Sequence, residues 1–286
     1  MKLSKDMNIL IVGLGLLGGS YAEALKKKGF TVNAITRSQS SVDYALEHGL
    51  IDGGTIEADP ALIAKADLVV FCLYPKVFTK WLEDNQQYLK SGAVLTDVTG
   101  VKSCIVYDIQ KNLRDDVEFI AAHPMAGREV YGVENATSKI FKKANYIVVP
   151  TSKNTAGAIE LCRDLGKTLG FKDVSELSPE MHDEMIAYLS QLTHVIAVSL
   201  MCCNDFRGLE NYTGDSFRDL TRIAKINENM WSELFLLNRD SLLREMDKFR
   251  RSFNEMYDKL ESGDIEGMCD MMRTSTERRQ RFDIKE

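Results

Sequence analysis

The chain has 286 residues, and its 44% hydrophobic and 27% charged residues are ordinary shares for a globular protein with one large core or two medium ones. The formal net charge of −6 argues against nucleic acid and anionic membrane as partners, because both require a basic face. Residues 1–7 lack the apolar core of a signal peptide, and no uninterrupted apolar run approaches the roughly 20 residues of a membrane span. We therefore expect a cytoplasmic protein.

The first elements of the chain predict a dinucleotide-binding unit. Residues 9–12 form an apolar run typical of a buried parallel strand, and a G-x-G-x-x-G motif follows where a strand would turn into a helix. We expect a helix over 21–28 and a second strand over 31–35; the alternative is a glycine-rich turn in another α/β domain. The residues expected to face a dinucleotide are Gly13, Leu14, Gly15, Leu16, Leu17 and Gly18, with Leu73 at the end of a later strand.

The three glycines of the motif have separate expected roles. Gly13 permits the tight turn, Gly15 lets the backbone approach a pyrophosphate, and Gly18 lets the helix lie against the strand. The amides at the helix N-terminus would then face the phosphates.

The segment after the second predicted strand bears on the choice of cofactor. An NAD-binding domain usually offers an acidic residue there to the ribose 2′-hydroxyl, and this chain has none. Thr36, Arg37 and Ser38 offer hydroxyls and a guanidinium, which suit a 2′-phosphate. This pattern favours NADP over NAD; on the alternative interpretation Arg37 is a solvated loop residue.

Strands and helices continue to alternate as far as residue 174. Such alternation predicts an α/β fold, a Rossmann-type doubly wound and mostly parallel sheet with helices on both faces. The expected strands are 67–73, 93–97, 119–122, 146–150 and 171–174, and the expected helices are 42–48, 77–89, 101–112 and 154–169.

The pattern changes at Ser178, a good N-cap that precedes Pro179, and a helix is predicted from there to about Asn204. From Ser241 onward, apolar residues recur at spacings of four and three, and this apolar seam is either a domain core or a subunit contact. We expect a dinucleotide-binding domain over 1–177, an all-helical domain for substrate binding and dimerisation over 178–286, and a homodimer. The seam consists of Leu242, Met246, Phe249, Phe253, Met256 and Leu260.

Of the four histidines, His123 follows a predicted strand of the sheet. Ligands of open parallel sheets bind beyond the carboxyl ends of the strands, so an imidazole there is suited to accept a substrate proton; the alternative is a structural histidine. His194 lies among apolar residues of the long helix, as a hydrogen-bonded core histidine would, and His48 and His182 are expected at the surface. The six cysteines show no metal-ligand spacing, so we expect reduced, buried thiols and no metal.

A cationic stretch occurs in the second half of the chain. If residues 214–225 are helical, Arg218, Arg222 and Lys225 share one face, which Asp219 neutralises in part. The stretch is either a salt-bridged surface helix or a clamp for substrate carboxylates, since a guanidinium binds a carboxylate in bidentate fashion.

Taken together, these motifs resemble the prephenate and arogenate dehydrogenase family of tyrosine biosynthesis. The likeness covers about residues 7–240. It rests on the Gly13–Ser20 loop, residues 97–102, residues 123–127 with Glu129 and 132–133, the helix 178–194, and residues 217–224 with Met230 and Trp231.

The resemblance implies an oxidative decarboxylation of prephenate to 4-hydroxyphenylpyruvate, with hydride transfer from C4 to a nicotinamide cofactor. It implies that His123 accepts the proton of the C4 hydroxyl, that Arg222 and its neighbour Arg218 bind substrate, with Arg222 on the ring carboxylate, and that His194 orients the ring. Glu129 would lie at the rim of the site, in a gating ion pair with a basic residue. The partner is thus a small-molecule substrate.

The chain departs from the family pattern in two places. Many members have a serine where this chain has Gly100; either Thr99 replaces its contact with the C4 hydroxyl or that contact is missing. Some relatives carry a second histidine where this chain has Gln191.

Three alternative functions remain open at this point. Asp215 lies where an acid could pair with the ammonium of arogenate, which makes arogenate dehydrogenase the alternative to the favoured prephenate dehydrogenase. Another two-domain reductase would be expected to carry a lysine on the interdomain helix. A non-catalytic NADP-binding sensor would bind the dinucleotide without turnover.

Overall fold

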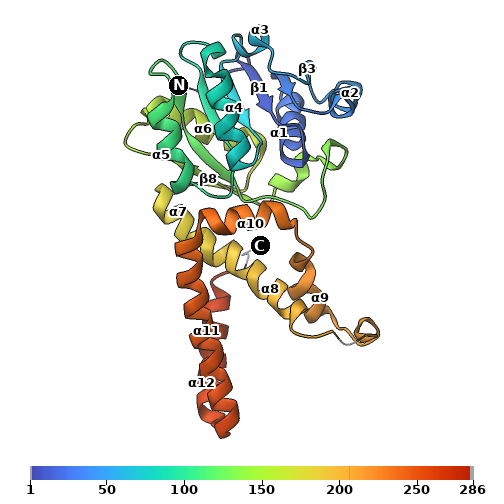
Figure 1. Ribbon diagram of the computed structural model, residues 1–286, viewed down its shortest axis with the longest axis vertical. Coiled ribbons are helices and arrows are strands. Elements are labelled where there is room, and N and C mark those ends of the chain that lie inside the picture. Colours follow the sequence, from blue (N-terminus) through green and yellow to red (C-terminus); the bar gives the residue numbers. More distant parts are fainter. Residues whose placement is uncertain (1, 206, 284–286) are drawn as a thin grey trace. The chain divides into compact units, whose positions relative to one another are not determined.

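A computed structural model describes residues 2–205 and 207–283. The chain forms two compact units, one that ends at Asn238 and a second that begins at Arg239 (Figure 1). The helices between residues 179 and 237 therefore belong to the same compact unit as the sheet. The expected domain boundary after residue 177 stays a prediction.

The first unit contains a six-stranded parallel sheet in the order β3-β2-β1-β4-β5-β6, the strand order of dinucleotide-binding Rossmann domains. A second, three-stranded sheet has the order β7-β8-β9, with β7 antiparallel and β9 parallel to β8. The strands are β1 (Asn8–Val12), β2 (Thr31–Ile35), β3 (Gly53–Thr55), β4 (Leu68–Phe71), β5 (Val94–Asp97), β6 (Glu118–Phe119), β7 (Ala121–Pro124), β8 (Asn145–Val149) and β9 (Asp173–Glu176).

Helices cover both faces of the sheet and bury two apolar clusters. On one face Tyr21 and Leu25 pack with Leu161 and Leu165, and on the other Phe78 packs with residues of β4 and β5. Both clusters are continuous with the strands, as the alternation of apolar segments predicts. The helices of this part are α1 (Leu16–Lys27), α2 (Gln39–Glu47), α3 (Pro60–Ile63), α4 (Pro75–Asn85), α5 (Ser103–Asn112) and α6 (Ala156–Leu169).

The predicted strand over 119–122 is in fact two short strands in different sheets. β6 pairs with β5, and after Ile120 the chain continues as β7, which pairs with β8. This change of sheet places His123 near the end of β7. The short elements β3 and α3 were not predicted, because three and four residues are too few to show a period.

The helical part of the first unit consists of α7 (Pro179–Ile186), α8 (Thr193–Cys202), α9 (Asp215–Thr221) and α10 (Glu228–Leu237). The predicted long helix is continuous, but a π-helical turn (Ala187–Leu192) separates α7 from α8. Ser178 accepts a hydrogen bond from the Met181 amide as the predicted N-cap. α10 reaches α4 through Glu233, whose Oε1 accepts the Lys76 amide at 3.1 Å.

One segment contradicts the expectation that no stretch resembles a membrane span. The helix Pro179–Cys202 is long and apolar enough to cross a membrane by length and composition. Isolated polar residues divide this segment, so it contains no uninterrupted apolar run of that length. His182, Asp183 and Gln191 are buried on this helix and hydrogen-bond within the protein.

The second unit is a pair of helices, α11 (Arg239–Ser262) and α12 (Ile265–Gln280). Gly263 has a φ of +70° between them, a conformation that favours glycine. Asp264 caps α12 by accepting the Gly267 amide.

The cysteines follow the expectation only in part. All six are free, but Cys202, Cys203 and Cys269 are exposed rather than buried.

Candidate active site

The Gly-rich turn has the geometry of a phosphate cradle between β1 and α1. Gly13 has a φ of +98°, and an added Cβ there would lie 2.4 Å from the Cys72 carbonyl oxygen. A Cβ at Gly18 would lie 2.0 Å from the Gly13 carbonyl oxygen, so α1 touches the turn. A Cβ at Gly15 would meet nothing within 4 Å, which leaves open space where a pyrophosphate would bind. The residues present therefore fit a dinucleotide.

The other predicted cofactor residues surround this turn. Leu73 follows β4, the neighbour of β1, and its Cδ2 would be 2.9 Å from a Cβ at Gly13. Leu14 is buried, whereas Leu16 and Leu17 are partly exposed. The chain order reverses between β1 and β4, and open α/β sheets bind ligands at such a crevice.

The predicted 2′-phosphate residues lie between β2 and α2. Arg37 is exposed and Thr36 is partly exposed. Ser38 caps α2, and its hydroxyl lies 2.7 Å from the Ser40 hydroxyl. A guanidinium beside a helix N-terminus lined by hydroxyls is a suitable place for an anion.

Two histidines and a carboxylate form a hydrogen-bonded line at the end of β7. His123 Nδ1 lies 2.9 Å from His182 Nε2, and His182 Nδ1 lies 2.8 Å from Asp183 Oδ1. The side chain of His182 is fully buried, so the expectation that it lies at the surface is wrong. His123 itself is partly exposed and can reach a ligand.

Main-chain amides bind Asp183, the carboxylate end of this hydrogen-bonded line. The amides of Lys102 and Ser103 donate to the two oxygens of Asp183 at 2.9 and 2.8 Å. Although burial acts to raise the pKa of Asp183, hydrogen bonds from His182 and Ser103 lower it. An ionised Asp183 fixes the proton of His182 on Nδ1, so His182 Nε2 accepts the Nδ1 proton of His123.

Electrostatics keep both imidazoles neutral. Burial lowers the pKa of His123, and the charges of His182 and Lys102 lower it further. Burial also lowers the pKa of His182, against the opposing effect of Asp183. In this tautomer His123 presents an unprotonated Nε2, as a general base must.

His194 lies at the start of α8, directly after the π-helical turn. Its Nδ1 bonds the Ser190 carbonyl at 2.8 Å, and its ring stacks on Trp231 of α10 with centroids 3.7 Å apart. Burial lowers its pKa, and Glu129 and Arg222 act on it with opposite signs. These contacts place His194 beside the ion pair that follows.

Arg222 and Glu129 form an ion pair between a loop after β7 and the end of α9. Their side chains are 62% and 39% exposed, so a ligand can reach both groups. Arg218 bonds Asp215 at 2.5 Å and the Thr213 carbonyl at 3.0 Å.

The predicted cationic face is interrupted. α9 ends at Thr221, a 3-10 turn follows over 222–224, and Lys225 is extended, so it does not continue a helical face with Arg218 and Arg222. The partner of Arg218 is Asp215 rather than Asp219.

Thr99 and Gly100 occupy different surroundings. Thr99 is 4% exposed, its hydroxyl donates to Asp97 and lies 3.0 Å from the Val101 carbonyl, and it accepts Lys102 Nζ at 3.1 Å. A Cβ at Gly100 would lie 3.9 Å from His123 Cε1 and 3.7 Å from Leu234. The geometry therefore favours a site in which no hydroxyl from residue 99 or 100 contacts the ligand.

Sequence reasoning missed His182 and Lys102. The one available signal was the neighbouring Asp183 on the same capped helix, since a carboxylate beside a histidine is able to orient the imidazole. Lys102 gave no signal, because a lysine in a loop is usually solvated. Among the described residues, no group of histidines, cysteines and carboxylates is suited to hold a metal.

The strand order and the glycine-rich turn are those of a dinucleotide-binding protein. The partly exposed histidine is a candidate general base, which a dehydrogenase requires. Residues 21–175 match the family model "Prephenate dehydrogenase, nucleotide-binding domain", and residues 178–274 match "Prephenate dehydrogenase, dimerization domain". The chain belongs to the prephenate dehydrogenase family.

Individual relatives and solved structures are similar to this protein along nearly its whole length. A prephenate dehydrogenase of Bacillus subtilis is 29% identical over 293 residues, which cover 100% of this chain and 78% of that one. The structure of Aquifex aeolicus prephenate dehydrogenase in complex with hydroxyphenyl propionate and NAD+ is 28% identical, with a TM-score of 0.88 over 99% of this chain and 100% of that one. Synechocystis arogenate dehydrogenase is 25% identical, with a TM-score of 0.83 over 97% and 100%.

Proposed function

We propose that this protein is a prephenate dehydrogenase, which oxidises and decarboxylates prephenate to 4-hydroxyphenylpyruvate. The observation that carries the proposal is the partly exposed His123 whose Nδ1 is hydrogen-bonded to His182, which Asp183 holds in turn. When bound, the dinucleotide supplies the nicotinamide ring that accepts the hydride from C4. His123 Nε2 takes the proton of the C4 hydroxyl as C4 becomes a carbonyl carbon. The bond between the ring and its carboxylate then breaks, carbon dioxide leaves, and the electron pair of that bond makes the ring an aromatic phenolate, which takes the proton back to give 4-hydroxyphenylpyruvate.

The remaining residues bind and orient the substrate. Arg222 would exchange Glu129 for the ring carboxylate, because the ion pair is exposed and a guanidinium binds either anion. Glu129 must then move away from Arg222 before the substrate binds, as expected of a gating residue at the rim of the site. His194 is held by Ser190 at Nδ1 and by the ring of Trp231, so its Nε2 is the nitrogen assigned to the substrate. Since aromatisation drives the reaction, the protein mainly positions groups and accepts one proton.

Arogenate is the alternative substrate, and Asp215 is the group that bears on it. Asp215 forms an exposed ion pair with Arg218. The two arginines of this region, Arg218 and Arg222, favour the more anionic prephenate.

Turnover assays separate the candidate functions. The purified protein is mixed with prephenate or arogenate, each with NADP or NAD, while the absorbance of the reduced cofactor is followed. We expect turnover with prephenate. Faster turnover with arogenate would overturn the substrate assignment. Binding of NADP without turnover of either compound would instead establish the sensor alternative.

We further propose NADP as the preferred cofactor. The support is local: Arg37 and the hydroxyls of Ser38 and Ser40 gather at the N-terminus of α2, and the segment carries no acid. A 2′-phosphate gains charge-assisted hydrogen bonds at such a place, whereas a 2′-hydroxyl does not. NAD is the alternative.

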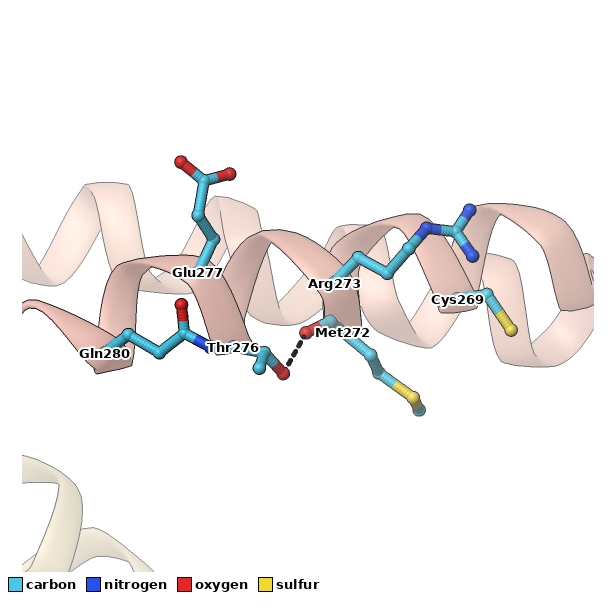
Figure 2. Close-up of a pocket in the computed structure, with 6 residues that line it drawn as sticks. All are labelled: Cys269, Met272, Arg273, Thr276, Glu277 and Gln280. Atoms are coloured by element: carbon cyan, nitrogen blue, oxygen red, sulfur yellow. Dashed lines mark hydrogen bonds between the residues drawn. The ribbon is translucent and has the colours of Figure 1, made fainter.

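We also propose a homodimer. Three residues of the apolar seam, Phe249, Phe253 and Leu260, are 40%, 63% and 67% exposed in the single chain. A hollow of about 470 Å³ lies along α12 and includes Met272 and Thr276 (Figure 2). A helix pair with so much exposed apolar surface is suited to cover a second copy of itself. A cytoplasmic location remains a prediction.

A further inference from the structure

A fully buried lysine lies directly behind the proposed base. The side chains of Lys102 and Asp97 are 0% exposed, and Lys102 Nζ lies 2.6 Å from Asp97 Oδ2. The same ammonium donates to the Ala122 carbonyl at 2.7 Å and to the Thr99 hydroxyl at 3.1 Å. Its three protons therefore have three acceptors, as a buried ammonium requires.

The Lys102–Asp97 pair holds both backbone polar groups of the residue before His123. Lys102 Nζ binds the Ala122 carbonyl, and Asp97 Oδ1 accepts the Ala122 amide at 3.1 Å. β7 begins at Ala121, so these bonds fasten the strand at the point where it presents His123.

Lys102 also contacts the other end of the hydrogen-bonded line. Its main-chain amide donates to Asp183 Oδ1 at 2.9 Å, and Asp183 orients His182. A single residue thus holds the strand that carries His123 and the carboxylate that fixes the tautomer of its partner.

We propose that Lys102, paired with Asp97, is a positioning residue that holds His123 and the His182–Asp183 pair in register and places a fixed positive charge behind His123. The proposal rests on the proposed function, because it concerns the base of that reaction. Fixed positioning of this kind matters because a small displacement of a base from its substrate proton slows the transfer.

The charge of Lys102 adds to the geometry. The titratable groups around His123 are His182 and Asp183 from α7, Asp97 from β5 and Lys102 itself. Burial, His182 and Lys102 all lower the pKa of His123. A buried ammonium that cannot move away makes an imidazolium unfavourable at this position.

The test replaces Lys102 with methionine, which has a similar length and no charge. Two readouts are followed: the NMR titration of the His123 ring signals without substrate, and the pH profile of kcat. We expect the pKa of His123 to rise, the acidic limb of kcat to shift to higher pH, and kcat at neutral pH to fall by about a hundred-fold, as a misplacement of roughly 1 Å can cause. Binding of the dinucleotide should be unchanged.

Lys102→Gln separates the two contributions. A glutamine amide can still donate to the Ala122 carbonyl but carries no charge, so kcat should recover in part while the pKa of His123 stays raised. Lys90→Met is the matched control, because Lys90 also pairs with an aspartate, Asp67, at the amino ends of the strands. The control should leave both readouts unchanged.

The outcomes distinguish this proposal from the proposed function. A folded Lys102→Met protein with an unchanged His123 titration and an unchanged kcat overturns the positioning role. So does a native chain in which His123 titrates at or above about 6.5, a result that needs no variant. A native enzyme that turns over neither substrate overturns the proposed function instead, and the substrate-free titration still decides the role of Lys102.

Discussion

At the scale of single residues, the site is defined by what lies behind His123. An isolated imidazole on a strand has no fixed tautomer, whereas here Asp183 and His182 determine which nitrogen carries the proton. The exposed pair Arg222–Glu129 is different in kind, since its partners are free to exchange. In the proposed reaction, the buried groups Asp183 and His182 fix the tautomer of the base, and the exposed groups Arg222 and Glu129 respond to the ligand.

A first prediction concerns His182. Replacing it with leucine removes the acceptor for His123 Nδ1, so the base loses its fixed tautomer. We expect kcat to fall by about ten- to a hundred-fold, within the range that general bases contribute, with little change in KM. His182→Gln places an oxygen near the former Nε2 and should recover part of the rate. Equal rates for the leucine and native enzymes would contradict the orienting role.

A second prediction concerns Arg37. Arg37→Ala should weaken NADP binding by about ten- to a hundred-fold, the value of one charge-assisted hydrogen bond, and leave NAD binding nearly unchanged. Titration of the protein with each dinucleotide measures both affinities, and NAD acts as the internal control. Equal losses for the two cofactors would show that Arg37 does not contact the 2′-phosphate.

At the scale of elements, close approach of backbone to backbone shapes the turn that is proposed to bind the cofactor. α1 lies against the turn after β1, because Gly18 has no side chain to separate them. The π-helical turn between α7 and α8 lies between His182 and His194, the histidines proposed to support the base and to contact the substrate. π-helical turns are frequent at functional sites, which agrees with this location.

A third prediction belongs to this contact. Gly18→Ala would place a Cβ 2.0 Å from the Gly13 carbonyl oxygen, a backbone atom that cannot rotate away. Either the helix or the turn must move, so dinucleotide affinity and the melting temperature should both decrease. Gly15→Ala is the matched variant, since its Cβ meets no protein atom within 4 Å. It should preserve the melting temperature and lose affinity alone. A Gly18→Ala protein with native melting and affinity would contradict the close packing.

At the scale of the whole molecule, large apolar side chains are exposed on the helices that follow the sheets, as at sites of association between proteins. Phe253 and Leu260 are mostly exposed on α11, as is Met272 on α12. The helix that matches a membrane span, Pro179–Cys202, also has much of its apolar surface outside the buried core. A second copy of the chain would cover such surface.

A fourth prediction tests the subunit contact. Phe253→Glu places a charge in the apolar seam and should shift the protein from dimer to monomer in analytical ultracentrifugation. Leu46→Glu is the control, because Leu46 is an exposed apolar residue of α2, at 44%, and does not belong to the seam. A native chain that sediments as a monomer at micromolar concentration would contradict the proposed dimer.

A fifth prediction concerns acid stability. The pKa values of His123, His182 and His194 are all lowered, chiefly by burial. Below about pH 6.5 the unfolded chain takes up protons that the native state excludes, so the free energy of unfolding should fall as the pH decreases. Denaturant titrations at pH 7.5 and pH 5.5 measure this. A His123→Gln variant should show a weaker pH dependence, and equal stability at both pH values would contradict the buried neutral state.

The sequence by itself predicted the elements whose signals are local. The G-x-G-x-x-G turn, the alternation of strands and helices, and the N-cap at Ser178 each depend on neighbouring residues, so their patterns are readable along the chain. His123 could be singled out for the same reason, because it directly follows an apolar strand. The family resemblance added the expected roles of Arg222 and Glu129.

Only the tertiary structure decided which distant groups meet. His182 has the local pattern of a surface residue, and its burial against His123 depends on how α7 packs on β7. Lys102 is buried because Asp97, Thr99 and the Ala122 carbonyl converge on it, including one acceptor 20 residues away. Asp97 and Thr99 lie in the same short segment as Lys102, but the Ala122 carbonyl comes from β7, and the burial of the whole group is set by the packing of the two sheets, which the segment alone does not reveal.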